Sequence, residues 1–230
     1  MSRILALVIA ANIVGASTAA FAAPTPERVR GTVTSITDSM LNVHTTSGSD
    51  VSVGLTGTTR YLEVAKSSLD HVASGSYIGT ATKSIGDKLV ALEVVVFPPS
   101  MKGTGEGHYS WDSIPDTTLS GGATTASAMT NGTVSVTPPT AGAGTVKSAM
   151  TNGTVSSAGE SGGAKQITVT YKGGKQIVLV PPTAPIVTFE PGKKSGVTEG
   201  KVVFINGVQE DGKVTANAVA VGIDGVTPPM

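Results

Sequence analysis

The sequence predicts an all-β protein built from two small five-stranded β-barrels. Gly, Ser, Thr and Val dominate a chain of 230 residues with an aromatic content of 4%, and this composition favours strands and turns over helices. Runs of four to eight β-branched residues alternate with short turns rich in Gly, Ser and Asp. The pattern of the first half returns in the second half, which indicates a tandem repeat.

The chain begins with the features of a secretory signal peptide, which we place at 1–22. A single positive side chain precedes a long apolar run and then small residues, as in secreted proteins. The triplet Ala20–Ala22 has small residues where a signal peptidase recognises them, so we expect cleavage after Ala22, or after Ala23 as the near alternative. A retained membrane anchor is the other interpretation, because Ile4–Ala20 approaches the length of a membrane span.

The composition restricts the compartment and the partners. The chain has no cysteine, which together with export favours a bacterial periplasm or bacterial secretion over a disulfide-linked extracellular domain. No second apolar run of membrane-spanning length follows the signal peptide, so a permease or channel is not expected. With 16 basic and 16 acidic side chains, the surface has no electrostatic preference for nucleic acid or anionic lipid. The expected partner is an envelope protein or a small ligand.

The first domain is expected over 25–101. Five β-branched runs bounded by turn residues predict five strands, at 29–36, 40–46, 50–55, 77–84 and 89–97. A short helix is possible before the fourth run, with Ser67 or Ser68 as its N-cap.

A second copy of this pattern predicts the second domain over 148–230. Arg30–Ile36 matches Asn152–Ala158, and the hairpin Leu41–Leu55 matches Ile167–Val180. A sheet of about seventy residues must close or be covered to protect its edges. Closed or partly closed barrels of the OB type, with strands 1 to 3, a connector and strands 4 and 5, satisfy this requirement.

The nonapeptide SAMTNGTVS occurs twice, at 127–135 and at 148–156. The second occurrence leads into the first strand of the second domain, so we interpret the first as a local duplication. We therefore expect an exit segment and flexible linker over 102–147, rich in Gly, Thr, Ala and Pro and mostly disordered from Thr118 onwards. In the alternative, Asn131–Val136 adds an edge strand to one barrel.

The recurring pattern of GTV, alternating Val, and DGKVTA resembles a family of bacterial exported domains of unknown function. Its members are expected to be small β-barrels that often occur in tandem, and some relatives are loosely catalogued as metal-transport components. For this chain the resemblance implies a fold and at most an accessory role in transport. The matching positions, such as Gly31, Gly153 and Gly212, are structural, so it implies no catalytic residue.

One motif resembles a catalytic nucleophile. GESGG, around Ser161, is similar to the nucleophile motif of chymotrypsin-like proteases, which also requires a histidine base and an aspartate. The chain has three histidines, none in the setting which that family uses, and too few strands for its two barrels. We interpret the motif as a flexible hairpin loop and predict no catalytic residue.

A candidate metal site lies at the exit from the first domain. Within thirteen residues the segment contains six side chains that could bind a metal ion or pack beside one: Met101, Glu106, His108, Tyr109, Trp111 and Asp112. Met101, His108 and Trp111 would suit Cu(I). Glu106 and Asp112, together with His108, would suit a divalent cation. In the alternative interpretation the aromatic side chains hold this segment against the barrel wall and His108 is merely solvated.

These observations predict a non-enzymatic binding or scaffolding module of the bacterial cell envelope. The alternative is a periplasmic accessory protein that binds copper or a divalent metal for a transport system. His44 and His71 could approach His108, but single histidines are more often ordinary polar residues. No cofactor other than such a metal ion is expected.

Overall fold

The computed structural model describes residues 23–118, 124–135 and 164–228. These residues form 13 strands that belong to one hydrogen-bonded sheet, so the predicted all-β class is confirmed. Three short 3-10 helices accompany the strands: η1 (Leu69–His71), η2 (Pro99–Met101) and η3 (Lys194–Gly196). Within the described ranges, no helix has the length and apolar character needed to cross a membrane.

Several features predicted from the sequence lie outside the described residues. They are the signal peptide at 1–22, the second nonapeptide at 148–156 and the GESGG motif around Ser161.

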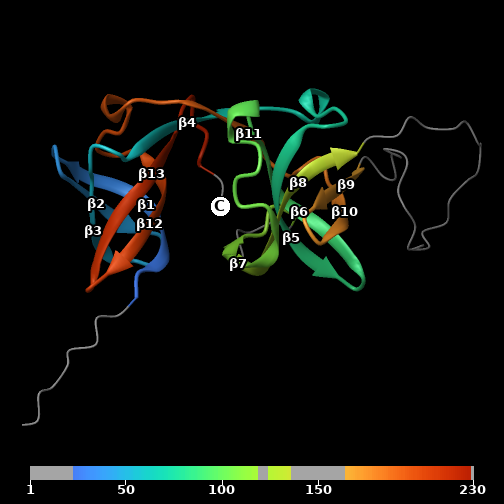
Figure 1. Ribbon diagram of the computed structural model, residues 1–230, viewed down its shortest axis with the longest axis horizontal. Coiled ribbons are helices and arrows are strands. Elements are labelled where there is room, and N and C mark those ends of the chain that lie inside the picture. The colour runs from blue at the N-terminus through green and yellow to red at the C-terminus, as the bar shows by residue number, and fades with distance from the viewer. Residues whose placement is uncertain (1–22, 119–123, 136–163, 229–230) are drawn as a thin grey trace, which may run out of the picture.

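The strands pair into two closed circuits, one at each end of the molecule (Figure 1). The first ring follows the order β1, β12, β13, β3, β2 and back to β1. Its strands are β1 (Thr25–Ile36), β2 (Met40–Thr45), β3 (Asp50–Gly54), β12 (Val202–Glu210) and β13 (Lys213–Gly222). The second ring follows the order β8, β5, β6, β10, β9 and back to β8. Its strands are β5 (Tyr77–Ile85), β6 (Lys88–Val96), β8 (Thr124–Ser135), β9 (Lys165–Tyr171) and β10 (Gly174–Val180).

The two halves of the chain exchange their last hairpins. The hairpin β5–β6 belongs to the first half, yet it pairs with β8 and β10 of the second half. The hairpin β12–β13 pairs with β1 and β3 of the first half. The sequence predicted that 25–101 and 148–230 would each form one domain. The pairings differ from that expectation, because each half contributes strands to both rings.

Two further strands carry the chain from one ring to the other. β4 (Arg60–Lys66) pairs parallel to β13, and β11 (Ile186–Pro191) pairs parallel to β6. They also pair antiparallel with each other, with Val64 opposite Phe189. A separate apolar cluster forms around this crossing and includes Val64, Phe189, Val95 of the second ring and Ala220 of the first ring. The crossing therefore buries apolar surface that neither ring could cover alone.

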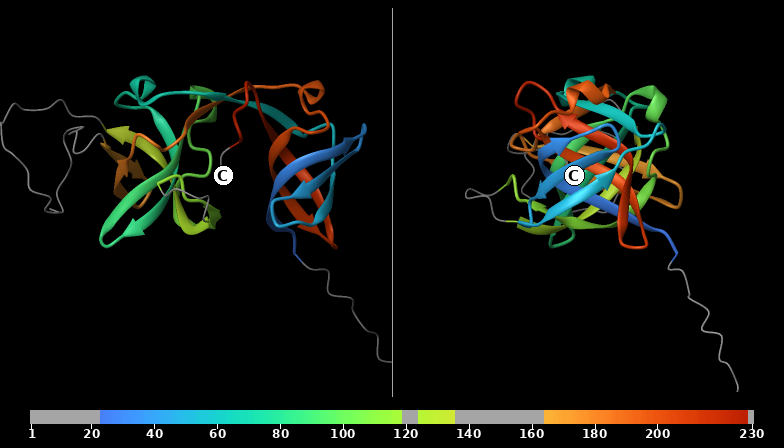
Figure 2. Two further views of the ribbon diagram at one scale, coloured as in Figure 1. Left: turned by 180° about the vertical axis from the view of Figure 1, so that it is seen from behind. Right: turned by 90° about the vertical axis from the view of Figure 1, so that its left-hand side faces the viewer.

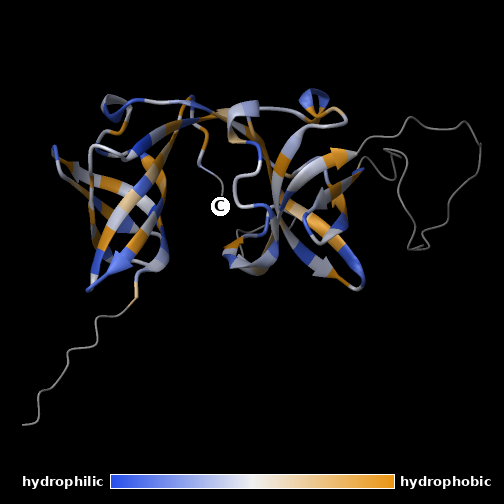
Figure 3. Cartoon of the chain, in the orientation of Figure 1, coloured by the Kyte–Doolittle hydropathy of each residue, from blue (hydrophilic) through white to orange (hydrophobic). Residues whose placement is uncertain are grey.

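Alternation of apolar and polar residues builds the interior of each ring, and Figure 3 shows this alternation along the strands. One core cluster fills the first ring, with Leu41, Val53 and Ile205 fully buried. Another fills the second ring around Ile78 and Val169. In Figure 2 the rings are separate lobes when seen from behind and lie one behind the other when seen from the side.

The predicted linker contains two strands. β7 (Gly107–Pro115) pairs with β8, and β8 is the first nonapeptide extended by three residues. β8 also pairs with β5 and β9, so it lies inside the sheet. The linker expectation is therefore wrong for these residues, and the edge-strand alternative was nearer. The sequence NGTVS fits the first strand of a ring equally well in either of its two occurrences.

Glycine marks the same corner in each ring. A Cβ on Gly31 of β1 would collide with the carbonyl oxygen of His44, and a Cβ on Gly132 of β8 would collide with that of Thr170. Gly31, which the sequence marks as a structural position, therefore allows a close approach of two backbones, and Gly132 is its counterpart in the second ring. Gly153, which the sequence aligned with Gly31, lies outside the described residues.

The short helix expected before the fourth run is η1. Ser68 is its N-cap, and its side-chain oxygen accepts a hydrogen bond from the backbone N–H of Asp70 at 3.0 Å. The helix is a single 3-10 turn, so the connector turns tightly from β4 into β5.

Candidate functional site

A cavity of about 640 Å³ lies between the two rings, and we call it the inter-ring cavity. Its walls are mostly apolar and come from both rings and from the crossing strands. Representative residues are Leu92 of β6, Ile114 of β7, Ile186 of β11 and Val203 of β12. Three charged side chains also line it: Arg30, Lys66 and Glu93. The cavity lies where the crossing strands carry the chain from one ring to the other.

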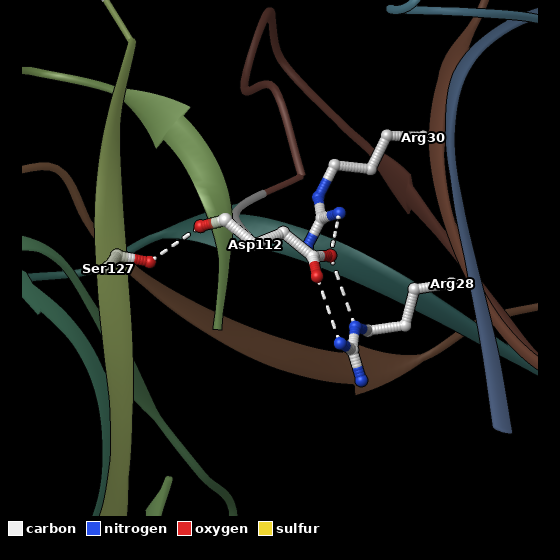
Figure 4. Close-up of polar contacts among 4 residues, drawn as sticks. All are labelled: Arg28, Arg30, Asp112 and Ser127. Atoms are coloured by element: carbon white, nitrogen blue, oxygen red, sulfur yellow. Dashed lines mark hydrogen bonds and ion pairs between the residues drawn. The ribbon is translucent and has the colours of Figure 1, made fainter. Parts of the chain in front are cut away.

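An ion cluster joins the rings beside this cavity (Figure 4). Arg28 of β1 donates from Nε to Asp112 Oδ2 at 3.1 Å and from Nη2 to Asp112 Oδ1 at 2.9 Å. Arg30 of β1 donates from Nη1 to Asp112 Oδ2 at 2.5 Å. Ser127 of β8 fixes the other side by donating to the backbone oxygen of Asp112 at 2.8 Å. One carboxylate of β7 thus holds two guanidinium groups of the first ring.

The cluster has a clear electrostatic consequence. Hydrogen bonds from Arg28, and next from Arg30, lower the pKa of Asp112 from 3.8 to about 2, although desolvation opposes them. The same contact raises the pKa of Arg28. Asp112 is therefore ionised throughout the physiological range, and the ion cluster persists there.

Aromatic rings stack on both arginines. The guanidinium carbon of Arg28 lies 4.2 Å from the centroid of Trp111, and that of Arg30 lies 4.9 Å from the centroid of Phe204. Such contacts stabilise a partly desolvated cation. In the described part of the chain, three N–H groups of this region are buried without a hydrogen-bond acceptor: Arg30 Nε, Arg30 Nη2 and Trp111 Nε1. Buried donors of this kind are rare in folded proteins and call for an explanation.

The five predicted metal ligands each make another contact in the structure. Met101 packs against the apolar cluster at the strand crossing. The Glu106 carboxylate accepts a hydrogen bond from the backbone N–H of Lys172 at 2.7 Å. Trp111 and Asp112 belong to the ion cluster with Arg28.

His108, the fifth of these residues, contacts the second ring. Its Nδ1 lies 2.8 Å from Thr130 Oγ1 of β8. Its imidazole stacks on the side chain of Tyr171 of β9, with a distance of 6.3 Å between the two aromatic centroids. The other two histidines are elsewhere, with His44 Nδ1 2.8 Å from Asp50 Oδ1 and His71 Nδ1 3.4 Å from Ser67 Oγ. In the described ranges, no three or more His, Asp or Glu side chains gather where they could hold a metal ion. Metal binding remains a prediction.

Arg28 and Arg30 were not predicted from the sequence as members of a site. They flank the buried Val29 on one strand, and side chains at i and i+2 of a strand share a face. Two arginines on the outer face of the same strand are the signal that could have identified them. Their partner Asp112 was singled out, but as a metal ligand. No local pattern predicts that β7 would face β1.

A second buried ion pair stabilises the segment after β7. Lys83 Nζ lies 2.6 Å from Asp116 Oδ2, and Asp116 accepts further hydrogen bonds from the side chain and backbone N–H of Thr118. The contact with Lys83 lowers the pKa of Asp116. Thr117 next to it donates to the backbone oxygen of Leu92 at 2.6 Å. These contacts hold the end of β7 against β6, where both strands contribute to the inter-ring cavity.

Comparisons with models of protein families, with curated proteins and with solved structures find no match to this chain. The resemblance to exported domains of unknown function stays a prediction, and functional inference depends on the geometry of the site.

Proposed function

We propose that the chain is a non-enzymatic binding module that holds a small molecule in the inter-ring cavity. The observation that carries the proposal is the cavity itself, whose volume of about 640 Å³ falls in the range of known small-molecule sites. Its apolar walls would retain the body of a ligand, and a few polar groups would orient it.

In this proposal each ring is an OB-like β-barrel, and the two barrels form a tandem pair with exchanged hairpins. The support is the strand order. Each ring has three consecutive strands, and its third strand pairs parallel with the last strand of the borrowed hairpin. That order is the one expected for five-stranded barrels with a connector before the fourth strand.

We place the protein in the bacterial cell envelope after removal of the signal peptide at 1–22. The support is the charged start, the apolar run and the small residues of that segment. The binding module would then act on an envelope component or on a small molecule that crosses the envelope.

A fluorescent probe tests the binding proposal. The neutral dye N-phenyl-1-naphthylamine should bind the mature protein saturably, with a rise in emission. Thr183→Phe should reduce this binding, because Thr183 is an exposed residue that lines the cavity and a larger side chain there occupies the space. Thr58→Phe is the matched control, since Thr58 is also exposed but lies in the turn before β4. Equal dye binding by both variants would contradict the proposal.

A further inference from the structure

One edge of the Arg30 guanidinium group has no partner among the described residues. Its Nη1 is bound to Asp112, whereas its Nε and Nη2 are buried and have no hydrogen-bond acceptor in that part of the chain. Nε and Nη2 form the side of an arginine that binds a carboxylate with two parallel hydrogen bonds. Arg30 is also one of the residues that line the cavity.

The structure already contains the completed version of this contact. Arg28, two residues earlier on β1, uses its own Nε and Nη2 to hold both carboxylate oxygens of Asp112 at 3.1 and 2.9 Å. The same edge of Arg30 has the same donors but no carboxylate. Trp111 Nε1 is a third buried donor without an acceptor, and its ring centroid lies 6.0 Å from the guanidinium carbon of Arg30.

The charged side chains around the cavity favour a ligand with one negative charge. Among the described residues, the positive side chains of the ion cluster and the cavity wall are Arg28, Arg30 and Lys66, and the negative ones are Asp112 and Glu93. A single positive charge is in excess among these five. The surplus matches a ligand with one negative charge, and the apolar walls match an uncharged body attached to it.

We propose that the ligand is a monocarboxylate with an apolar body, and that its carboxylate binds the free Nε and Nη2 edge of Arg30. This inference rests on the proposed function of the inter-ring cavity. The carboxylate meets this edge when the Arg30 side chain turns towards the cavity that it lines, and the contact then repeats the geometry that Asp112 has with Arg28. The apolar body lies against partly exposed side chains of the cavity wall such as Ile186 and Val226.

Octanoate and 1-octanol test the head group, because they share the same chain and differ in charge. In calorimetric titrations of the mature protein, octanoate should bind at least about ten times more tightly than 1-octanol, as expected for a charged two-bond contact. Octyl phosphate should bind more weakly than octanoate at pH 8, because it carries close to two negative charges and the cavity has one in excess.

Three variants test whether Arg30 is the residue that binds the carboxylate. Arg30→Gln should lower the octanoate affinity about tenfold or more and leave the 1-octanol affinity unchanged. Arg30→Lys should recover little of the loss, since an ammonium group lacks the two-donor edge. Arg28→Gln is the matched control, because Arg28 also contacts Asp112 but does not line the cavity, and it should change octanoate affinity less than about threefold.

The outcomes separate this inference from the function on which it rests. If octanoate and 1-octanol bind equally and Arg30→Gln has no effect, the carboxylate assignment is overturned while the cavity still binds apolar molecules. If Arg28→Gln and Arg30→Gln weaken octanoate equally, the arginines act only through the fold and the assignment is also overturned. If neither octyl compound nor the neutral dye binds, both the assignment and the proposed function fail.

Discussion

Replacing Asp112 by asparagine removes the carboxylate that joins Arg28 and Arg30 of the first ring to β7, the strand that pairs with β8 of the second ring. The pKa of Asp112 falls from 3.8 to about 2 in the folded protein, a difference that corresponds to about 2.4 kcal/mol of stability. The side chain is 34% exposed, so solvent screening reduces this figure. We expect Asp112→Asn to lower the free energy of unfolding by about 1 to 2 kcal/mol at pH 7.

The pH dependence gives the sharper test of the same reasoning. Because the folded pKa of Asp112 is depressed, its contribution is complete above about pH 4 and is lost as the pH falls towards 2. Urea unfolding of wild type and Asp112→Asn should therefore differ most at pH 7, about half as much at pH 3, and little at pH 2. Asp50→Asn is the matched control, since the Asp50 side chain is 83% exposed in its pair with His44. A difference between wild type and Asp112→Asn that does not change with pH would refute the electrostatic account.

Two further predictions concern the rings. Gly132→Val should destabilise the protein by about 1 to 3 kcal/mol in thermal or urea unfolding, because the new side chain collides with backbone. Gly57→Val is the control and should keep a stability near that of the wild type, since Gly57 has open space around it. Equal stability of the two variants would contradict the close backbone approach at Gly132. The hairpin exchange predicts that Thr25→Cys with Gln209→Cys, which lie opposite each other on β1 and β12, forms a disulfide in this cysteine-free chain. The pair Thr25→Cys with Ser84→Cys, which would be opposed if each half closed its own ring, should stay reduced, and the reverse result would rule out the exchange.

The local features of the fold could be predicted because they depend on neighbouring residues. Alternating apolar residues identify the strands of the first ring, and the side chain of Ser68 caps the short helix. Gly31 stands where a Cβ has no room. Each of these signals involves chemistry within one strand, one turn or one hairpin.

The hairpin exchange could not be predicted, because the two final hairpins are nearly interchangeable. β5–β6 and β12–β13 have similar lengths and apolar patterns, so either could close either ring. The direction taken by β4 and β11 decides between them, and that direction depends on contacts such as Val64 with Phe189, far apart in sequence. Local patterns also do not predict that the nonapeptide at 127–135 forms β8, because the same sequence occurs at 148–156.

The candidate site was hidden for the same reason. Arg30 belongs to a strand of the first ring, Glu93 to β6, and Ile114 to a segment predicted as linker. The cavity that they share appears only when two rings are held apart by crossing strands. Asp112 was noticed for its carboxylate, but its partners Arg28 and Arg30 lie more than eighty positions away.

The most direct test of the account is to locate a bound octyl chain by NMR. With isotope-labelled methyl groups in the mature protein, the octyl chain of octanoate should give nuclear Overhauser contacts to Ile186 and Val226, which line the inter-ring cavity and are partly exposed. It should give none to Ile78 and Ile205, which are fully buried inside the second and the first ring. Contacts confined to the ring interiors or to the outer surface, with Ile186 and Val226 silent, would contradict the claim that the protein binds its ligand between the rings.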